Sequence, residues 1–255
     1  MFGKMLAAVG IGGARIQTVL DQDEVTVGGR ITGTIHIAGG TVDQSIEGVF
    51  ITLATAVQHE HDDRRWQESH DLNTVHVSTS FLLLAGSHHE IRFAIDVPLH
   101  TPVTLDGGEA VTWLRTRLAI QSAVDVTDTD AIVVHPVPVM VDALNALINL
   151  GFELVKCDVE HRPCWHEGHG LVQEFEFRPS TRATCRFDEV ELVFLPDEFG
   201  GLTLMVEVDR AARGLRGQLA EATGLDESWY RMSIPGDIVG PGEEPIRQAL
   251  AGILF

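Results

Sequence analysis

Apolar and polar residues alternate along most of the chain between residues 14 and 135. The alternation is clear in segments 30–37, 49–57 and 91–97. Successive side chains of a strand point to opposite faces, so this period of two predicts strands with one buried face. Turns rich in glycine or proline separate the strands, at residues 28–29, 39–40, 85–87, 98–102 and 106–108. Short strands between such turns indicate antiparallel sheets packed face to face, so we predict a β-sandwich for residues 14–135.

The same pattern returns in residues 152–235. Segments 171–177, 190–194 and 202–208 again alternate apolar with polar residues. We predict a second antiparallel β-sandwich here, with one short helix over 215–223 and a returning strand over 229–234.

Between the two strand-rich regions the pattern changes from period two to a helical spacing. Pro136 and Pro138 lack a backbone donor and cannot continue a sheet ladder. Beyond them Met140, Leu144, Leu147 and Ile148 fall on one helical stripe, and Gly151 stands where a helix C-cap glycine would. We therefore predict that residues 136–151 link the two domains through a short helix.

Both ends of the chain also have helical spacing of apolar residues. It predicts an amphipathic helix in residues 1–13, and another after a flexible linker in residues 236–255. These helices could pair with each other, cap a sheet edge or bind a partner protein. The candidate partner-binding residues on them are Phe2, Met5, Leu6, Val9, Ile246, Leu250 and Ile253.

Composition narrows the classes of partner. The 255 residues are 44% hydrophobic, enough for a sizeable core, and the formal net charge is −19. This charge repels nucleic acid and anionic lipid surfaces, and the apolar run near residue 5 is too short for a stable membrane insertion. Three cysteines are an odd number that does not suit a disulfide framework, so we expect a cytoplasmic protein.

Several longer motifs resemble the Spo0M family of bacterial sporulation-control proteins. The similarity covers nearly the whole chain, and three of its motifs together are specific. The matching segments are Lys4 to Gly12, Val111 to Leu114, Asp125 to Asp130, Val134 to Pro136, Leu144 to Leu147, Leu150 to Phe152, Val172 to Phe177, Leu192 to Pro196 and Glu207 to Leu215.

The resemblance implies an arrestin-like fold, with two tandem β-sandwich domains and short terminal and linker helices. It also implies a non-enzymatic adaptor or scaffold in sporulation or cell-division control, without cofactor or catalytic residues. Its partners would be proteins, and a second copy of the chain is one candidate.

A cluster of cysteine and histidine residues is the strongest candidate for other chemistry. Cys157, His161, Cys164 and His166, with His169 and Cys185 downstream, offer thiolate and imidazole ligands of the kind that zinc takes. The spacing lacks the paired CxxC of known zinc modules. We therefore predict no metal site, and keep a zinc-dependent hydrolase or sensor as the alternative function.

Two other groups have simpler interpretations. His59, His61 and His70 could approach a metal but suit a polar hairpin end. Asp125, Asp128 and Asp130 offer oxygens for calcium, but short acidic residues are favoured turn formers.

One basic cluster stands out in this acidic chain. Arg210, Arg213 and Arg216 could bind a carboxylate or phosphate of a partner, or pair with nearby acids. A third hypothesis for function, a sandwich that binds a small ligand, predicts a deep pocket lined by Trp113 or Trp165.

Overall fold

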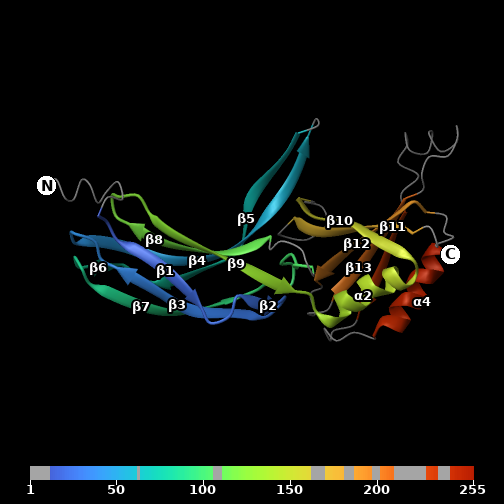
Figure 1. Cartoon of the computed structure of the whole chain (residues 1–255), viewed down its shortest axis with the longest axis horizontal. Helices are drawn as coiled ribbons and strands as arrows, with labels where there is room; N and C mark the ends of the chain where they lie inside the picture. The colour runs from blue at the N-terminus through green and yellow to red at the C-terminus, as the bar shows by residue number, and fades with distance from the viewer. Residues whose placement is uncertain are drawn as a thin grey trace. The chain divides into compact units, whose positions relative to one another are not determined.

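Strands make up most of the described residues in the computed structural model of the chain, and two helices accompany them there (Figure 1). This composition confirms the predicted all-β fold class. The structure describes residues 12–61, 64–105, 111–161, 170–180, 187–196, 202–209, 228–234 and 242–255.

Contacts within the chain divide it into two compact units. Unit 1 comprises residues 1–56 and 69–135, and unit 2 comprises residues 57–68 and 136–255. The division after residue 135 falls at the proline-containing link. Residues 57–68, which the sequence analysis assigned to the first domain, group with unit 2, because the end of a long strand pairs there through Gln58 and Glu160.

Unit 1 contains two sheets. In the smaller one, β3 (Arg30–Ala38) lies between β1 (Arg15–Leu20) and β7 (His88–Asp96), and all three pair antiparallel. The larger one has the order β4, β8, β9 and β2, with β5 and β6 also paired to β4. Its strands are β4 (Gln44–His61), β8 (Thr112–Ile120), β9 (Val126–His135), β2 (Glu24–Thr26), β5 (Arg64–Ser78) and β6 (Phe81–Leu83). The last residues of β4 and the first of β5 belong to the segment 57–68 that groups with unit 2.

The core of unit 1 comes from the alternating apolar positions of both sheets. Ile35 of β3 and Ile95 of β7 are at most 1% exposed, as are Ile51 and Leu53 of β4 and Leu114 of β8. All of them except Leu114 are positions that the period-two pattern placed on the buried faces. The two sheets therefore form the sandwich that the sequence predicted for this region.

The described strands of unit 2 form one antiparallel sheet in chain order. They are β10 (Phe152–His161), β11 (Leu171–Pro179), β12 (Glu189–Pro196), β13 (Leu202–Asp209) and β14 (Ser228–Ile234). The register between β10 and β11 shifts between Leu154 and Lys156, the mark of a β-bulge.

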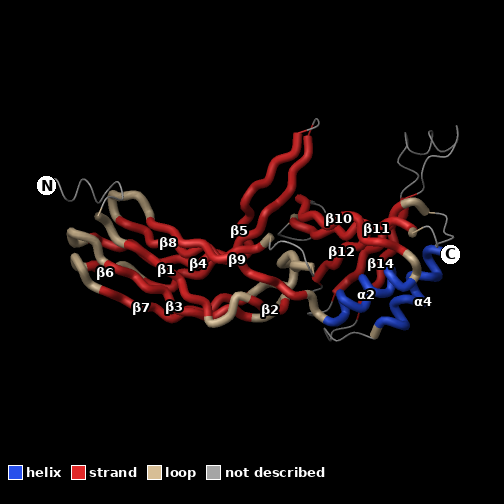
Figure 2. The backbone as a smooth tube through the Cα atoms, viewed as in Figure 1, coloured by secondary structure: helices blue, strands red, loops and turns tan. Residues whose placement is uncertain are grey.

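Two helices supply the remaining layer of unit 2 (Figure 2). Helix α2 (Pro138–Asn149) contacts helix α4 (Glu243–Leu254) and strand β10, and the amide of Asn149 donates a hydrogen bond of 2.6 Å to Glu243 Oε1. Within the described part of unit 2 these helices provide the apolar covering that the strand pattern assigned to a second sheet.

Helix α2 confirms the helix predicted for the link. It has a proline in its first turn, and Gly151 after its C-terminus has a φ of 94°, which glycine adopts without strain. Met140, Leu144 and Leu147 are buried as predicted, but Ile148 is 52% exposed. The buried stripe instead widens through Ala143 and Ala146, whose small side chains let the helix approach its neighbours.

Candidate functional site

One face of the unit 2 sheet gathers charged side chains from four neighbouring strands. The register pairs Lys156 with Glu176, Glu176 with Glu191, and Glu191 with Glu207. These pairings place the four residues in one row across β10, β11, β12 and β13. Because side chains alternate along a strand, the apolar residues between them occupy the opposite face, where Phe175 and Phe177 are at most 1% exposed.

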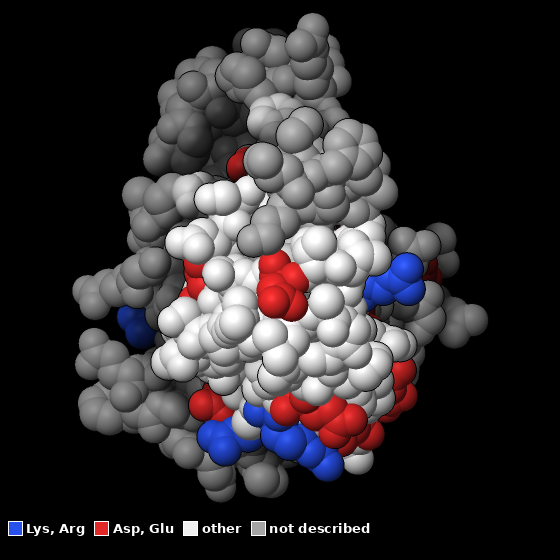
Figure 3. All heavy atoms as spheres, turned by 90° about the vertical axis from the view of Figure 1, so that its left-hand side faces the viewer, with Lys and Arg blue, Asp and Glu red and all other residues white. Residues whose placement is uncertain are grey.

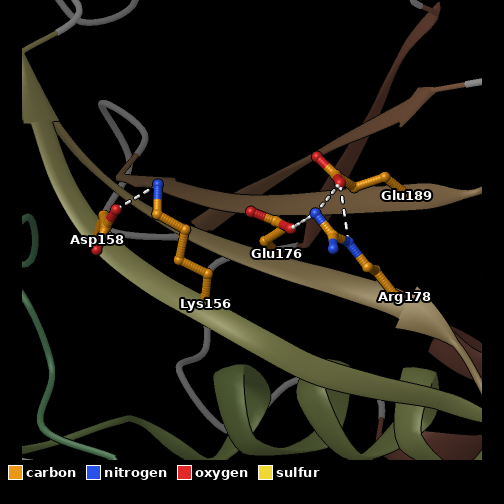
Figure 4. A network of polar contacts seen from close by, with 5 residues as sticks. All are labelled: Lys156, Asp158, Glu176, Arg178 and Glu189. Carbon is orange, nitrogen blue, oxygen red and sulfur yellow. Dashed lines mark hydrogen bonds and ion pairs between the residues drawn. The ribbon is translucent and has the colours of Figure 1, made fainter. Parts of the chain in front are cut away.

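Arg178 connects two of the carboxylates on this charged face (Figure 4). Its Nη2 lies 2.8 Å from Glu176 Oε1 and 2.9 Å from Glu189 Oε2, and its Nε donates to the same Glu189 oxygen at 3.2 Å. Farther along the face Lys156 forms an ion pair with Asp158. We call these five residues the unit 2 charge network.

The network changes the acidity of its members. Burial raises the pKa of Glu189, and the nearby Glu176 carboxylate adds to the rise, while the hydrogen bond from Arg178 opposes it. Hydrogen bonds to Glu189 and to Asp158 raise the pKa of Arg178 and of Lys156, respectively. The two cations therefore stay charged, and Arg178 offsets the cost of keeping two carboxylates together.

Three carboxylates of this face come close enough to share a cation. One oxygen each from Glu176, Glu189 and Glu191 lies within 4.8 Å of the others, and all three side chains are half-buried. Oxygen ligands of this kind suit calcium or magnesium. Arg178 already contributes positive charge to two of them, which offsets part of the repulsion among the carboxylates.

The sequence analysis did not single out this network. Its signal was the alternation of acidic with apolar residues in 171–177 and 189–194. That alternation showed that the acids share a face of each strand, but the pairing of strands was needed to bring Glu176 beside Glu191.

The zinc candidates are placed unfavourably where the structure describes them. Cys157 and His161 lie on the same strand, four residues apart, so their Cα atoms are about 13 Å apart. Zinc ligands lie within about 2.3 Å of the metal, and these two side chains cannot span the separation. Cys164, His166, His169 and Cys185 lie outside the described residues.

The surroundings of Cys157 also favour its neutral thiol over the thiolate. Burial raises the pKa of its thiol to about 11, against the lowering effect of a hydrogen bond of 3.3 Å from Gln173 Nε2. A metal takes the thiolate, which this environment disfavours. The site therefore gives no support to the zinc alternative.

The histidines near residue 60 make contacts within the β4–β5 hairpin. The His59 ring stacks on Trp66 with 5.3 Å between centroids, and His59 Nε2 lies 3.5 Å from Glu68 Oε2. These contacts agree with the interpretation of a polar hairpin end. The side chain of His61 lies outside the described residues, and His70 is half-buried on β5.

Of the three aspartates considered for calcium, Asp125 alone caps a turn. It accepts hydrogen bonds from Arg117 Nη1 at 2.8 Å and from the Ile120 amide at 3.1 Å. Burial acts to raise its pKa, but these two hydrogen bonds outweigh burial and lower it.

Asp128 and Asp130 correct the turn interpretation, because both lie within strand β9. Asp128 accepts a hydrogen bond of 2.6 Å from the Thr18 amide of β1. Burial, with the neighbouring Asp128 charge, raises the pKa of Asp130. Strand propensity of Val133, Val134 and their neighbours overrides the turn preference of short acids here.

The predicted partner-binding residues of the C-terminal helix require a correction. Ile246 and Leu250 are at most 1% exposed, because α4 packs within unit 2, and Ile253 is half-buried. An apolar helical stripe looks the same whether it covers its own domain or a partner. The other candidates, Phe2, Met5, Leu6, Val9, Arg210, Arg213 and Arg216, lie outside the described residues.

Two further observations concern the remaining hypotheses. Trp113, one of the two tryptophans considered for a ligand pocket, is half-buried on strand β8, and Trp165 lies outside the described residues. Among the described residues, neither helix is both long and apolar enough to cross a membrane.

Comparison with known proteins identifies the family. A family model described as SpoOM protein matches residues 2–212. The sporulation-control protein Spo0M of Bacillus subtilis is 38% identical over 232 residues, which cover 91% of this chain and 89% of that protein. The crystal structure of Spo0M from Bacillus subtilis superposes with a TM-score of 0.80 and 34% identity, covering 95% of this chain and 98% of that one. The chain therefore belongs to the Spo0M family.

Proposed function

We propose that this protein is a sporulation-control regulator that acts by binding other proteins and has no catalytic activity. The observation that carries the proposal is the 38% identity to the Bacillus subtilis sporulation-control protein over 91% of the chain. This similarity extends through both units, which argues that the whole molecule shares the role of the Bacillus subtilis protein. We propose that it acts in the cytoplasm.

The described polar clusters support a binding role over a catalytic one. Arg178 joins two glutamates, Asp128 anchors the β1 backbone, and burial keeps the Cys157 thiol neutral while it accepts a hydrogen bond from Gln173. Each of these groups has a structural use. Catalytic groups are instead expected to have a pKa matched to proton or group transfer near neutral pH.

Complementation tests the regulatory role. The chain would be expressed in a Bacillus subtilis strain that lacks its own Spo0M, and heat-resistant spores would be counted. We expect spore formation to return toward the wild-type number. A matched control is the Leu250→Asp variant, which places a charge in the core of unit 2 and should not complement. Failure of the intact chain to complement, although it accumulates to the level of the native protein, would contradict the proposal.

A biochemical experiment separates the binding role from the zinc alternative. Protein purified without added zinc would be assayed for bound metal and for hydrolysis of ester and phosphoester substrates. We expect no stoichiometric zinc and no hydrolysis. Stoichiometric zinc, lost together with a hydrolytic activity on chelation, would overturn the non-catalytic proposal.

The surface used for partners can be mapped with two variants. One lacks residues 1–13, and the other replaces Arg210, Arg213 and Arg216 with glutamine. Proteins cross-linked to each variant in sporulating cells would be compared with those of the intact chain. Loss of the same partners in one variant assigns binding to that segment, whereas identical partner sets would assign it to the sheets. Finding no cross-linked partner for any form would count against the adaptor role.

A further inference from the structure

An apolar surface lies at one end of unit 1, where three loops meet. Leu82 is 57% exposed, Leu84 is 52% exposed and Val124 is 65% exposed. Figure 3 faces this end, and residues other than Lys, Arg, Asp and Glu cover much of the described surface around one acidic side chain near its middle, while a larger group of charged side chains lies toward its lower edge. In a chain of net charge −19, such an uncharged area is unusual. We call Leu82, Leu84 and Val124 the end patch.

Strand pairing brings the members of the end patch together. Leu82 of β6 lies opposite Ser45 of β4, and the Gln121 amide donates a hydrogen bond of 2.9 Å to the Ser45 carbonyl from the other side. Leu84 follows Leu82 by two residues, and Val124 follows Gln121 in the tight turn between β8 and β9. The patch therefore spans three neighbouring chain segments.

The loop that carries Leu84 is held firmly. The Gly39 amide donates to the Ser87 carbonyl at 2.8 Å, and the Gly86 amide donates to the Gly40 carbonyl at 3.0 Å. A Cβ on Gly39 would lie 2.1 Å from the Leu84 carbonyl oxygen, so only glycine permits this approach. A surface fixed in this way loses little entropy when something binds to it.

The N-terminal segment of the chain joins the described structure beside the end patch. Thr41, in the loop next to Gly40, holds the Gly12 carbonyl through its amide at 2.8 Å and its hydroxyl at 3.1 Å. Residues 1–11 lie outside the described residues, and they are therefore joined to the molecule beside the end patch. Their sequence contains a single charged residue, Lys4, and the apolar residues Phe2, Met5, Leu6 and Val9.

We propose that the end patch is the docking surface for the apolar side chains of residues 2–9 of the same chain. Eleven residues reach about 16 Å as a helix and about 36 Å fully extended, either of which suffices for a surface next to their point of attachment. A tether this short gives an effective concentration in the millimolar range, so a modest apolar contact is enough for binding.

Trypsin provides the test, because Lys4 is the first of its cleavage sites and Arg15 is the next. The intact protein would be digested briefly and cleavage after Lys4 followed by mass spectrometry. We expect Leu84→Asp to accelerate this cleavage about tenfold, since a charge on the patch releases the segment. The matched control is Ile148→Asp, which changes an equally exposed apolar residue of α2 in unit 2 and should leave the rate unchanged.

A reciprocal variant makes the experiment specific. Leu6→Asp should accelerate cleavage to the same degree, and the double variant Leu6→Asp with Leu84→Asp should be no faster than either single change, as expected for residues that contact each other. Thermal unfolding of each variant checks that the fold is intact.

Two results would overturn the proposal. One is an equal cleavage rate in the wild-type protein and in Leu84→Asp with the fold intact. The other is protection of Lys4 that grows with protein concentration together with a dimer in sedimentation, which would assign the end patch to a second copy of the chain.

Discussion

In unit 1 the apolar faces of two sheets cover each other, whereas in unit 2 two helices supply the apolar covering of one sheet. Ile35 and Leu114 represent the first arrangement, and Leu147 and Leu250 represent the second; all four are fully buried. Both units began from strands with the same period-two pattern. The pattern therefore shows that a sheet has an apolar face but does not show what covers it.

The polar groups of the two units differ as well. Unit 1 places neutral hydroxyls in its interior, where Thr18 Oγ1 and Thr116 Oγ1 lie 2.7 Å apart. Unit 2 places charges on the sheet face opposite its apolar one, in the network around Arg178. Hydroxyls can satisfy each other in a buried space, but charges need opposite charges and partial access to water.

The largest expected effect tests the helix covering of unit 2. We expect Leu250→Ala to lower the free energy of unfolding by about 2–5 kcal/mol, because it leaves a cavity between α4 and its neighbours. Urea denaturation measures the change. Phe255→Ala, at a residue 52% exposed, is the matched control and should change stability by less than about 0.5 kcal/mol. Equal effects of the two substitutions would show that α4 does not pack on unit 2.

A smaller effect is expected for the hydroxyl pair of unit 1. Thr116→Val leaves the buried Thr18 hydroxyl without this partner, which costs about 1–3 kcal/mol. Replacing both threonines by valine should be less costly than the sum of the single changes, because no hydroxyl is then left unpaired. Denaturation of the two single variants and the double variant gives the coupling free energy. Strict additivity would contradict a direct hydrogen bond.

The charge network of unit 2 should appear in the pH dependence of stability. Burial already raises the pKa of Glu189, and Arg178 opposes that rise. A carboxyl whose folded-state pKa is raised favours the folded state fully below its unfolded value, about 4.3, and loses this contribution as pH rises through the folded value. We therefore expect the stability of Arg178→Met to fall more steeply above about pH 4.3 than that of the wild type.

The matched variant in unit 1 is Arg30→Met. Arg30 pairs with one carboxylate, Asp96, at 2.6 Å, and both side chains are more than 60% exposed, at 62% and 68%. Exposed pairs of this kind contribute little, so the pH profile of stability should follow that of the wild type. Parallel profiles for Arg178→Met and Arg30→Met would show that the unit 2 network has no collective effect.

The last prediction concerns the chemical reactivity of the Cys157 thiol and involves no change in the stability of the protein. The Cys157 thiol has a pKa of about 11, against an ordinary value of 9.0, so its thiolate fraction at pH 8 should be about a hundredfold lower. We expect slow alkylation by iodoacetamide in the folded protein and fast alkylation in urea, with each cysteine followed by mass spectrometry of its peptide. Rapid alkylation of Cys157 in the folded protein would contradict the raised pKa of this half-buried thiol.

Local patterns predicted much of the fold because they depend on neighbouring residues alone. Pro136 and Pro138 end a strand wherever they occur, and Gly151 accepts a positive φ after α2. One prediction that failed rested on the preferences of single residues. Asp128 and Asp130 were assigned to a turn, but they belong to a strand whose pairing with β8 outweighs the preference of a short acid.

The chain's order of strands, its proline-marked link and its two helical stripes follow from backbone chemistry that each segment carries by itself. Tertiary structure alone decided three further features: the burial of Ile246 and Leu250 against their own unit, the pairing of Arg178 with Glu176 and Glu189, and the exposure of Leu82 and Leu84. The sequence shows which residues form an apolar face and which residues are charged, so it shows that the face must be covered and that the charge must be paired. Which group meets that need depends on contacts between residues far apart in the sequence.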